Sequence, residues 1–313
     1  MKNYPSIDIL FVCYNCGKDI SVVIKDILSS SYPIDKLKFI VVDNDSHDGS
    51  MSFVENIEFP NITTVYTGEN LGFGRACNVA IPELSADYLL LVNPDVKIFK
   101  NSIENLIKAA QKNQENMIYG GRVLDENGED SGLSAFKEPT LLGLISWAFF
   151  IDIMREYFNV NRFDAYNSSE LIDNAAVDSI PGCFFLIKTS LFKSLNGFDE
   201  RFFMYSEEVD LCKRARECFS AKPMLVVDSN LIHIGGGTTS GLNKLNLLYK
   251  HRLVYYKKHW SGLKFNVARY ILKLAFLIRR IFYYCLSKLN GKYTDKHTLW
   301  KELYDLQKKW NVI

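Results

Sequence analysis

The feature that most constrains the fold of this chain is the alternation, through its first half, of short apolar runs with segments of helical periodicity. The apolar runs are typical of buried strands and cover residues 7–15, 36–44, 62–67 and 88–92. The helical segments cover residues 19–31, 47–55, 70–81 and 102–112. Strands that alternate with helices in this way form parallel sheets with helices on their faces. The pattern therefore predicts an α/β fold.

The alternation becomes less regular in the second half. Residues 178–188 form an apolar run with an interior Pro-Gly pair, which predicts a strand that bends near a ligand. A helix is expected over residues 206–219, and a further strand over residues 222–228. The apolar segment 141–150 is too short to span a bilayer.

The distribution of charge divides the chain into two parts. Residues 1–241 contain 21 Lys and Arg against 33 Asp and Glu, whereas residues 242–313 contain 16 against 3. With 48% hydrophobic residues in a chain of 313, a full core can be buried. We therefore predict an acidic α/β domain over residues 1–241 and a basic helical extension over residues 242–313.

The predicted extension combines basic and aromatic residues. Its longest apolar stretch, Tyr270–Leu286, is interrupted by Lys273, Arg279 and Arg280, which argues against a membrane-spanning helix. A basic, aromatic helix of this kind is typical of proteins that lie in the headgroup region of an anionic membrane. The alternative is a pair of helices that pack on the domain with their charges in solvent. Nucleic acid could use the same side chains, but the acidic body makes it a poor partner, and we expect none.

The first residues and the cysteines point to the cytoplasm. Residues 1–15 lack the long apolar segment and the small-residue cleavage site of a signal peptide, so we do not expect export. Seven cysteines scattered among apolar segments fit reduced thiols better than a disulfide framework. Cys13 and Cys16 have the spacing of a redox or zinc pair, but no second pair exists and Cys13 ends a strand-like run. We expect both to be buried thiols.

A cluster of acids marks the start of the helix predicted from residue 206. Ser206 has the side chain of an N-cap, and Glu207, Glu208 and Asp210 follow it in the first turn. Acids at this place are ordinarily helix stabilisers, because the helix dipole favours negative charge there. A functional role for them is favoured because another acid is expected at the ligand-binding edge of the predicted sheet.

That other acid, Asp95, comes shortly after an apolar strand, and ligand sites in open α/β sheets gather at the carboxyl ends of strands. Asp43 ends another strand and could accept hydrogen bonds from a base or ribose, although an Asx-turn explains it better when it is taken alone. His233 precedes three glycines and suits a ligand for a divalent ion. A lone histidine is more often structural, but Asp95 as a first ligand favours the metal role. One carboxylate for a metal ion and another for proton abstraction suit a metal-assisted group transfer.

A glycine-rich segment opens the helix predicted over residues 70–81. Gly72 and Gly74 allow close approach of a phosphate or sugar, and Arg75 supplies positive charge. A glycine-rich helix start with a surface arginine is equally consistent. Position 77 is a cysteine, so the dinucleotide fingerprint is incomplete, and the segment follows the third strand. Both facts argue against a dehydrogenase.

Taken in order, these segments resemble the family 2 glycosyltransferases of the GT-A fold, in particular bacterial rhamnosyltransferase-like members. The matching segments are FVCYN, VVDNDSHDGS, NLGFGRACN, LLLVNPDV, IPGCFFLIK, NGFDERFFMYSEEVDLCKRAR and HIGGG. They span about residues 7–237 in the family's usual order. The resemblance implies a Rossmann-like fold with a mixed central sheet, and sugar transfer from a nucleotide donor with inversion at the anomeric carbon.

The resemblance also implies contacts to the nucleotide-sugar donor. Tyr14 and Asp43 correspond to contacts with its base and ribose. Gly72 and Arg75 lie where the family lines the nucleotide-sugar pocket. Gly182, in the predicted bend of the strand near the ligand, is a further expected substrate contact.

A metal site is implied at the Asn93-Pro94-Asp95 sequence, which stands where the family has its D-x-D motif. Asp95 would bind the divalent cation, Mg²⁺ or Mn²⁺, that bridges the diphosphate. Asn93 replaces the first acid of the motif and can position a ribose or a metal-bound water without adding negative charge. His233 matches a histidine that ligates the metal in some members.

The Glu-Glu pair stands where the family has an acid followed by its aspartate base. Glu208 corresponds to the base and Glu207 to a carboxylate that positions the acceptor, with Asp210 as a further substrate contact. Glutamate reaches one methylene further than aspartate, so the choice between Glu207 and Glu208 stays open. In an inverting transfer the acceptor hydroxyl attacks opposite the leaving diphosphate, so one base and one counter-charge suffice.

We therefore expect an inverting glycosyltransferase that is cytoplasmic and peripheral on the inner face of the membrane. The expected donor is dTDP-rhamnose or a UDP-sugar. The expected acceptor is a glycan, or a glycan on a polyprenyl lipid, in surface polysaccharide synthesis. Two alternatives stay open. One is a sugar-phosphate nucleotidyltransferase, and the other is a non-catalytic sugar-nucleotide-binding scaffold, which Asn93 and the Glu-Glu pair would favour.

Overall fold

The computed structural model describes residues 4–157, 163, 165–166, 170–233 and 241–311. The chain forms two compact units. The first consists of Met1–Glu138, Tyr166–Phe203 and Glu207–Thr238, and the second of Pro139–Ala165, Met204–Ser206 and Thr239–Ile313. The second unit thus contains the basic C-terminal part and two internal segments. The predicted division at residue 241 assigns those two segments to the first domain.

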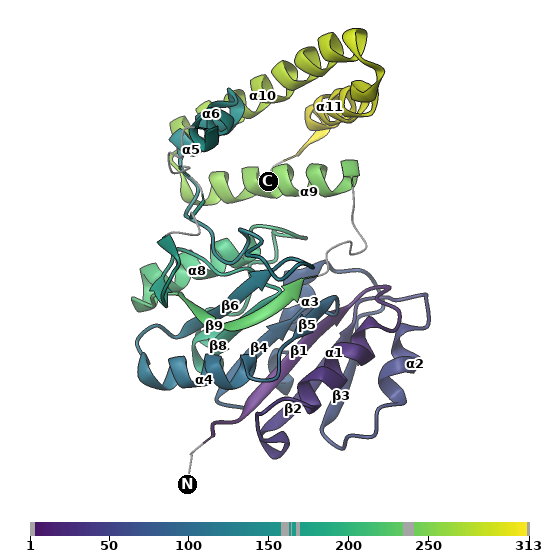
Figure 1. Ribbon diagram of the computed structural model, residues 1–313, viewed down its shortest axis with the longest axis vertical. Helices are drawn as coiled ribbons and strands as arrows, with labels where there is room; N and C mark the ends of the chain where they lie inside the picture. Colours follow the sequence, from purple (N-terminus) through teal and green to yellow (C-terminus); the bar gives the residue numbers. More distant parts are fainter. Residues whose placement is uncertain (1–3, 158–162, 164, 167–169, 234–240, 312–313) are drawn as a thin grey trace. The chain divides into compact units, whose positions relative to one another are not determined.

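The first unit is a sheet with helices on its faces (Figure 1). Its strands are β1 (Ile7–Cys13), β2 (Leu37–Asp43), β3 (Ile62–Tyr66), β4 (Tyr88–Val92), β5 (Val96–Ile98), β6 (Ile118–Leu124), β7 (Ala175–Ala176), β8 (Phe184–Lys188) and β9 (Met224–His233). Its helices are α1 (Asp19–Leu28), α2 (Ser50–Glu55), α3 (Phe73–Val79), α4 (Ser102–Lys112), α7 (Thr189–Ser194) and α8 (Glu207–Phe219).

The sheet is mixed, as the resemblance implies. Its strand order is β3-β2-β1-β4-β8-β6-β9-β5, with β7 paired to β9. Strands β3, β2, β1 and β4 are parallel neighbours, which confirms the prediction made from the alternation of strands and helices. Strand β8 runs antiparallel to both β4 and β6. The sheet therefore continues beyond the parallel half through an antiparallel strand.

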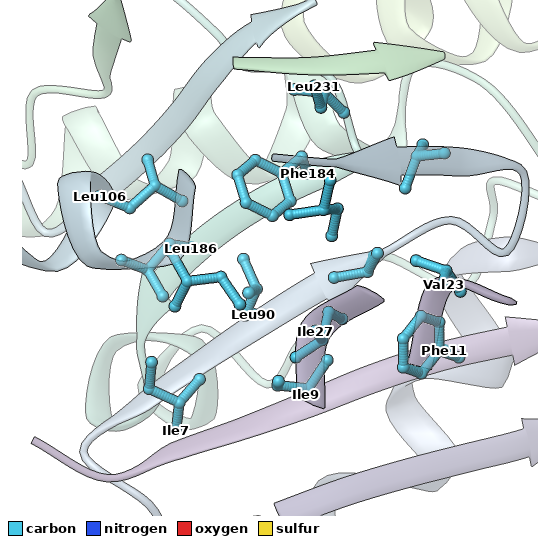
Figure 2. Packing of buried hydrophobic residues seen from close by; sticks show 14 of the residues in the cluster. Ile7, Ile9, Phe11, Val23, Ile27, Leu90, Leu106, Phe184, Leu186 and Leu231 are labelled. Atoms are coloured by element: carbon cyan, nitrogen blue, oxygen red, sulfur yellow. The ribbon is translucent and has the colours of Figure 1, made fainter. Parts of the chain in front are cut away.

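The core lies on both faces of this sheet. Ile7, Ile9 and Phe11 of β1 belong to one buried cluster with α1 and α4, whereas Leu10 belongs to a second with α3, α7 and α8. Successive side chains of a strand point to opposite faces, so a strand buried on both sides reads as an unbroken apolar run. Figure 2 shows the first cluster, where side chains of β1, β4 and β8 meet those of α1 and α4.

Two local predictions near the site need correction. The strand predicted over residues 178–188 begins only at Phe184, and Gly182 lies in the turn before it. Ser206 is not a regular N-cap, because it has a positive φ of 71°, whereas an N-cap residue normally has an extended backbone. Glu207 and Glu208 nevertheless occupy the first turn of α8, as predicted.

The prediction for the cysteines is wrong at one pair. Cys13 and Cys16 form a disulfide, whereas the other cysteines are free thiols. Asn15 has a positive φ of 50°, so the chain turns back directly after β1. The two Cα atoms are consequently 5.8 Å apart, within the usual range for a disulfide. The strand-like run up to Cys13 does not reveal this turn.

The second unit is helical. Its helices are α5 (Leu141–Ala148), α6 (Ile151–Tyr157), α9 (Gly241–His259), α10 (Gly262–Leu289) and α11 (Thr294–Leu306). Helix α10 packs against α5, α9 and α11. Within the described ranges, no helix has both the length and the apolarity needed to cross a bilayer.

Candidate active site

The candidate site lies at the carboxyl ends of the parallel strands. Tyr14 follows β1, Asp43 ends β2, and Asn93 follows β4. Cys13 and Asp43 are register partners in the β1–β2 ladder, so the ends of these two strands are level. Because parallel strands end at the same edge of a sheet, the residues predicted to contact the donor share that edge.

Asp43 is buried, and its carboxylate is engaged in the turn that follows β2. Its Oδ1 accepts a hydrogen bond from the N–H of Ser46 at 3.1 Å. The carboxylate thus stabilises the turn, as its sequence predicts, although the bond comes from the third residue on rather than from the second, which an Asx-turn would use. A contact of Asp43 with the donor stays a prediction.

Asn44, which the sequence alone does not distinguish from an ordinary turn residue, joins this turn to the glycine-rich loop. It is buried, and its amide nitrogen donates to Oδ1 of Asn70 at 3.0 Å. Its Oδ1 accepts from the N–H of Leu71 at 2.9 Å. The loop that contains Gly72 is thereby fixed beside the end of β2.

Gly72 occupies a position that only glycine fits. Its φ is +79°, and a Cβ atom there would lie 2.0 Å from the carbonyl oxygen of Phe203. That oxygen accepts a hydrogen bond from the N–H of Phe73 at 2.9 Å. The close approach joins the start of α3 to the segment that precedes α8. Arg75, on the first turn of α3, is half-buried, and its guanidinium forms no hydrogen bond or ion pair with the described residues.

The two predicted metal ligands are brought together by the β5–β9 ladder. Val96 is the register partner of His233, and the Nε2 atom of His233 lies 3.3 Å from Oδ1 of Asp95. Burial acts to raise the pKa of Asp95, but the hydrogen bond and charge of His233 outweigh it, helped by Asn93, and hold that pKa below its usual value. Asp95 is therefore an anion at neutral pH, as a metal ligand must be.

The turn before β8 lies between this pair and the acid-bearing helix. The N–H of Asn93 donates to the carbonyl oxygen of Cys183 at 3.0 Å. Burial raises the pKa of the Cys183 thiol to about 12, and the charges of Asp95 and Glu208 add to that rise. Both carboxylates therefore lie near the same thiol. A Cβ at Gly182 would meet the ring of Phe73 at 3.3 Å, so this turn also packs on the start of α3.

The two glutamates of α8 have different surroundings. Glu208 is half-buried, and its Oε2 atom is buried without a hydrogen-bond partner among the described residues. Burial raises the pKa of Glu208 to about 7. Glu207 is buried against α3, where it lies beside Gly74. The pKa of the Cys77 thiol on α3 is raised mainly by the burial of that thiol, and the charge of Glu207 adds to the rise. Glu208 is thus the glutamate on the side of Asp95.

Asp210 is not brought to this group. It has no exposed surface, and its Oδ2 forms an ion pair with Nε of Arg214 at 2.7 Å within α8. Arg214 also donates to the carbonyl oxygens of Leu195 and Gly197. The pair ties α8 to the segment after α7, and this geometry does not favour the predicted substrate contact.

The donor set suits a metal ion that shares its coordination with a substrate. Among the residues that the structure describes, no group of three or more His, Cys, Asp or Glu side chains could hold an ion. Asp95 and His233 supply two ligands, and Mg²⁺ commonly takes one or two carboxylates together with substrate phosphates. These residues therefore fit a cation bound with a diphosphate rather than a closed protein site. The three glycines that follow His233 in the sequence lie within residues 234–240, outside the described residues.

Comparison with solved structures defines the class of fold. The mannosyltransferase PcManGT from Pyrobaculum calidifontis, in complex with GDP-mannose and Mn²⁺, superposes with a TM-score of 0.61 at 14% identity, covering 99% of this chain and 88% of that one. GalNAc-T7 with UDP, GalNAc and Mn²⁺ gives a TM-score of 0.63 at 12% identity, covering 100% and 59%. The chain has the GT-A fold of nucleotide-sugar glycosyltransferases.

The sequence places the chain within that class. It belongs to glycosyl transferase family 2, whose family model matches residues 8–192. It is 29% identical over 188 residues to the N-acetylglucosaminyl-diphospho-decaprenol L-rhamnosyltransferase of Mycobacterium tuberculosis, which covers 56% of this chain and 59% of that protein. It is 28% identical over 155 residues to the rhamnosyltransferase WbbL of Escherichia coli, covering 47% and 55%. The chain thus spans less than two thirds of the length of these relatives.

Proposed function

We propose that this protein is an inverting hexosyltransferase that moves rhamnose or another hexose from a dTDP- or UDP-sugar to a hydroxyl group of a lipid-linked glycan. The observation that carries the proposal is the placement of Asp95 with His233 and of Glu208 around Cys183. Asp95 is ionised and paired with His233, whereas burial raises the pKa of Glu208 toward neutral pH. This difference suits one group for charge stabilisation and the other for proton transfer.

Glu208 is the proposed general base. A base works best when its pKa lies near the operating pH, and burial raises that of Glu208 to about 7. Its Oε2 atom, which no described residue engages, is available to accept the proton of the acceptor hydroxyl. Removal of that proton accompanies attack of the oxygen on the anomeric carbon from the side opposite the diphosphate. The anomeric configuration is therefore inverted in one step.

Asp95 and His233 are the proposed ligands on the donor side. A divalent cation held by them would offset the negative charge that develops on the leaving diphosphate. Arg75 offers a second cationic group, because its guanidinium is not engaged by the described residues. We assign the base and ribose of the donor to Tyr14 and Asp43, at the edge where β1 and β2 end.

The acceptor class is proposed from the relatives. The Mycobacterium tuberculosis protein is named for rhamnosyl transfer to a diphospho-decaprenol carrier. We propose a glycan on a polyprenyl diphosphate as the acceptor, and a cytoplasmic protein that works at the inner surface of the membrane. A sugar-phosphate nucleotidyltransferase is less well supported, because the loop after β1 is the disulfide-closed Cys13–Cys16 rather than a glycine-rich basic loop.

The test is product analysis with the full chain. The protein is incubated with dTDP-rhamnose and UDP-sugars, a polyprenyl diphosphate-linked sugar, and Mg²⁺ or Mn²⁺. We expect release of a nucleoside diphosphate and a glycosylated acceptor whose anomeric configuration, read by NMR, is opposite to that of the donor. Release of pyrophosphate would instead identify a nucleotidyltransferase. Binding of donors with neither transfer nor hydrolysis would identify a scaffold.

A further inference from the structure

Helix α10, in the second unit, has an inner face that is fully used in packing. Its buried residues are Ala268, Leu272, Ala275, Phe276 and Arg279. The Arg279 guanidinium donates to the carbonyl oxygens of Ala148 and Trp147 and lies 3.8 Å from the centre of the Trp147 ring. The charge on this face is therefore satisfied inside the unit.

The opposite face of α10 is apolar and exposed. Leu263, Val267, Tyr270, Ile281 and Tyr284 are exposed large apolar side chains. At 100° per residue they fall in one stripe along the helix, on the side away from the buried residues. A helix of a soluble unit normally turns charged or polar side chains outward. An outward apolar stripe that runs from Leu263 to Tyr284 marks an interaction surface.

The charges on α10 indicate what that surface meets. The helix contains six Lys and Arg and no Asp or Glu. Arg279 is turned inward, whereas Arg269 and Lys273 are exposed beside the stripe and form no ion pair with the described residues. A long helix with an apolar stripe, flanking cations and no acids is suited to the interface of an anionic membrane, where lipid phosphates supply the counter-charge.

The apolar surface continues onto a part of the chain far from the C-terminus. The ring centres of Phe150 and Phe282 are 5.3 Å apart. This contact joins the corner between α5 and α6 to the C-terminal half of α10. Phe149, Ile151 and Ile153 at that corner are exposed. The charge asymmetry of residues 242–313 could not have pointed to this corner, because it lies about a hundred residues earlier in the sequence.

We propose that the α10 stripe and the α5–α6 corner together form a docking surface that lies on an anionic lipid bilayer, with α10 in the plane of the interface. The proposal extends the lipid-linked acceptor of the proposed function. It is tested without any sugar substrate, so failure of vesicle binding and failure of sugar transfer can be told apart.

The experiment measures flotation of the full chain with phosphatidylcholine vesicles, with and without phosphatidylglycerol. The stripe variant carries Leu263→Ser, Tyr270→Ser and Ile281→Ser, at side chains that are 78%, 67% and 54% exposed, so its fold should be retained. The matched control carries Leu133→Ser, Tyr66→Ser and Ile34→Ser, which are 51%, 58% and 51% exposed in the first unit.

We expect the wild type and the control to float with the anionic vesicles and the stripe variant to bind about tenfold more weakly or worse. Binding of the wild type should fall in about 1 M NaCl, where the Debye length shrinks to about 3 Å. Failure of the wild type to bind at low salt, or equal loss in the control, would overturn the proposal. So would a concentration-dependent dimer that the stripe variant alone abolishes, because the stripe would then cover a second copy.

Discussion

Glu207 and Glu208 are chemically identical neighbours, and their surroundings alone separate their roles. Glu207 is buried against α3, whereas Glu208 lies near Cys183. The charge of Asp95 also raises the pKa of the Cys183 thiol. Burial raises the pKa of Glu208 to about 7, well above the ordinary glutamate value of 4.5. The sequence left the choice between the two glutamates open, and this environment favours Glu208 as the base.

The raised pKa of Glu208 predicts the pH dependence of transfer. A base must be ionised to act, so kcat/KM should increase with pH and level off above about 7. Initial rates at subsaturating donor and acceptor, measured between about pH 5 and pH 9, test this. Circular dichroism at each pH controls for loss of structure. A profile that is flat above pH 5, with an inflection near the ordinary glutamate value, would contradict the assignment.

Gly72 offers a second test, because Gly68 is a matched control in the same loop region. Both have positive φ, +79° and +72°, but a Cβ at Gly72 would meet the Phe203 carbonyl, whereas nothing lies within 4 Å of one at Gly68. Gly68→Ala should lower the free energy of unfolding by about 1 kcal/mol through backbone strain. Gly72→Ala should lower it by about 3 kcal/mol or more, since overpacking is added. Equal losses in urea unfolding would show that the contact with Phe203 is unimportant.

The helices and strands that a local pattern of apolar residues specifies agree best with their predicted bounds. The helix predicted over residues 102–112 and the strand over residues 88–92 are observed with the same bounds. Their apolar spacing alone specifies them. The links between elements escape such patterns. Asn44 holds the Gly72 loop through hydrogen bonds to residues 26 to 28 positions away. Nothing in its own neighbourhood distinguishes it from an ordinary turn residue.

The same limit explains which parts of the site were predicted. The sequence predicts Asp95 and His233 as partners, and the β5–β9 ladder places them together. Asp210 is a predicted substrate contact, yet its carboxylate pairs with Arg214 one helical turn further on. Spacing along a helix shows that Asp210 and Arg214 can meet, but it does not show which of the acids turns toward the sheet edge.

The loop between β1 and α1 carries the Cys13–Cys16 disulfide, which the sequence does not predict. In denaturant without reductant, the protein should show five reactive thiols, because Cys13 and Cys16 are joined. Reduction should lower the free energy of unfolding by about 2 kcal/mol, the chain-entropy value for so short a loop. The Cys16→Ala variant should show no such change on reduction. Seven reactive thiols in the unreduced wild type would contradict the disulfide.

For the whole molecule, family membership and catalytic assignment rest on different parts of the chain. The family model matches residues 8–192, which include Asp43, Gly72 and Asp95. Glu208 and His233 lie beyond that match, on α8 and β9. The likeness in fold to the mannosyltransferase PcManGT extends over 99% of the chain at only 14% identity. Membership in family 2 therefore does not by itself test the proposed base.

The decisive measurement is the rate of sugar transfer by a Glu208→Gln variant, with donor affinity determined on the same preparation. Glu217→Gln is the matched control, because Glu217 is an exposed glutamate of the same helix that forms a surface ion pair with Lys213. We predict that Glu208→Gln lowers kcat about 10²–10⁴-fold, the usual contribution of a positioned base, with donor affinity and the control unchanged. Full transfer activity in Glu208→Gln would show that this carboxylate is not the base.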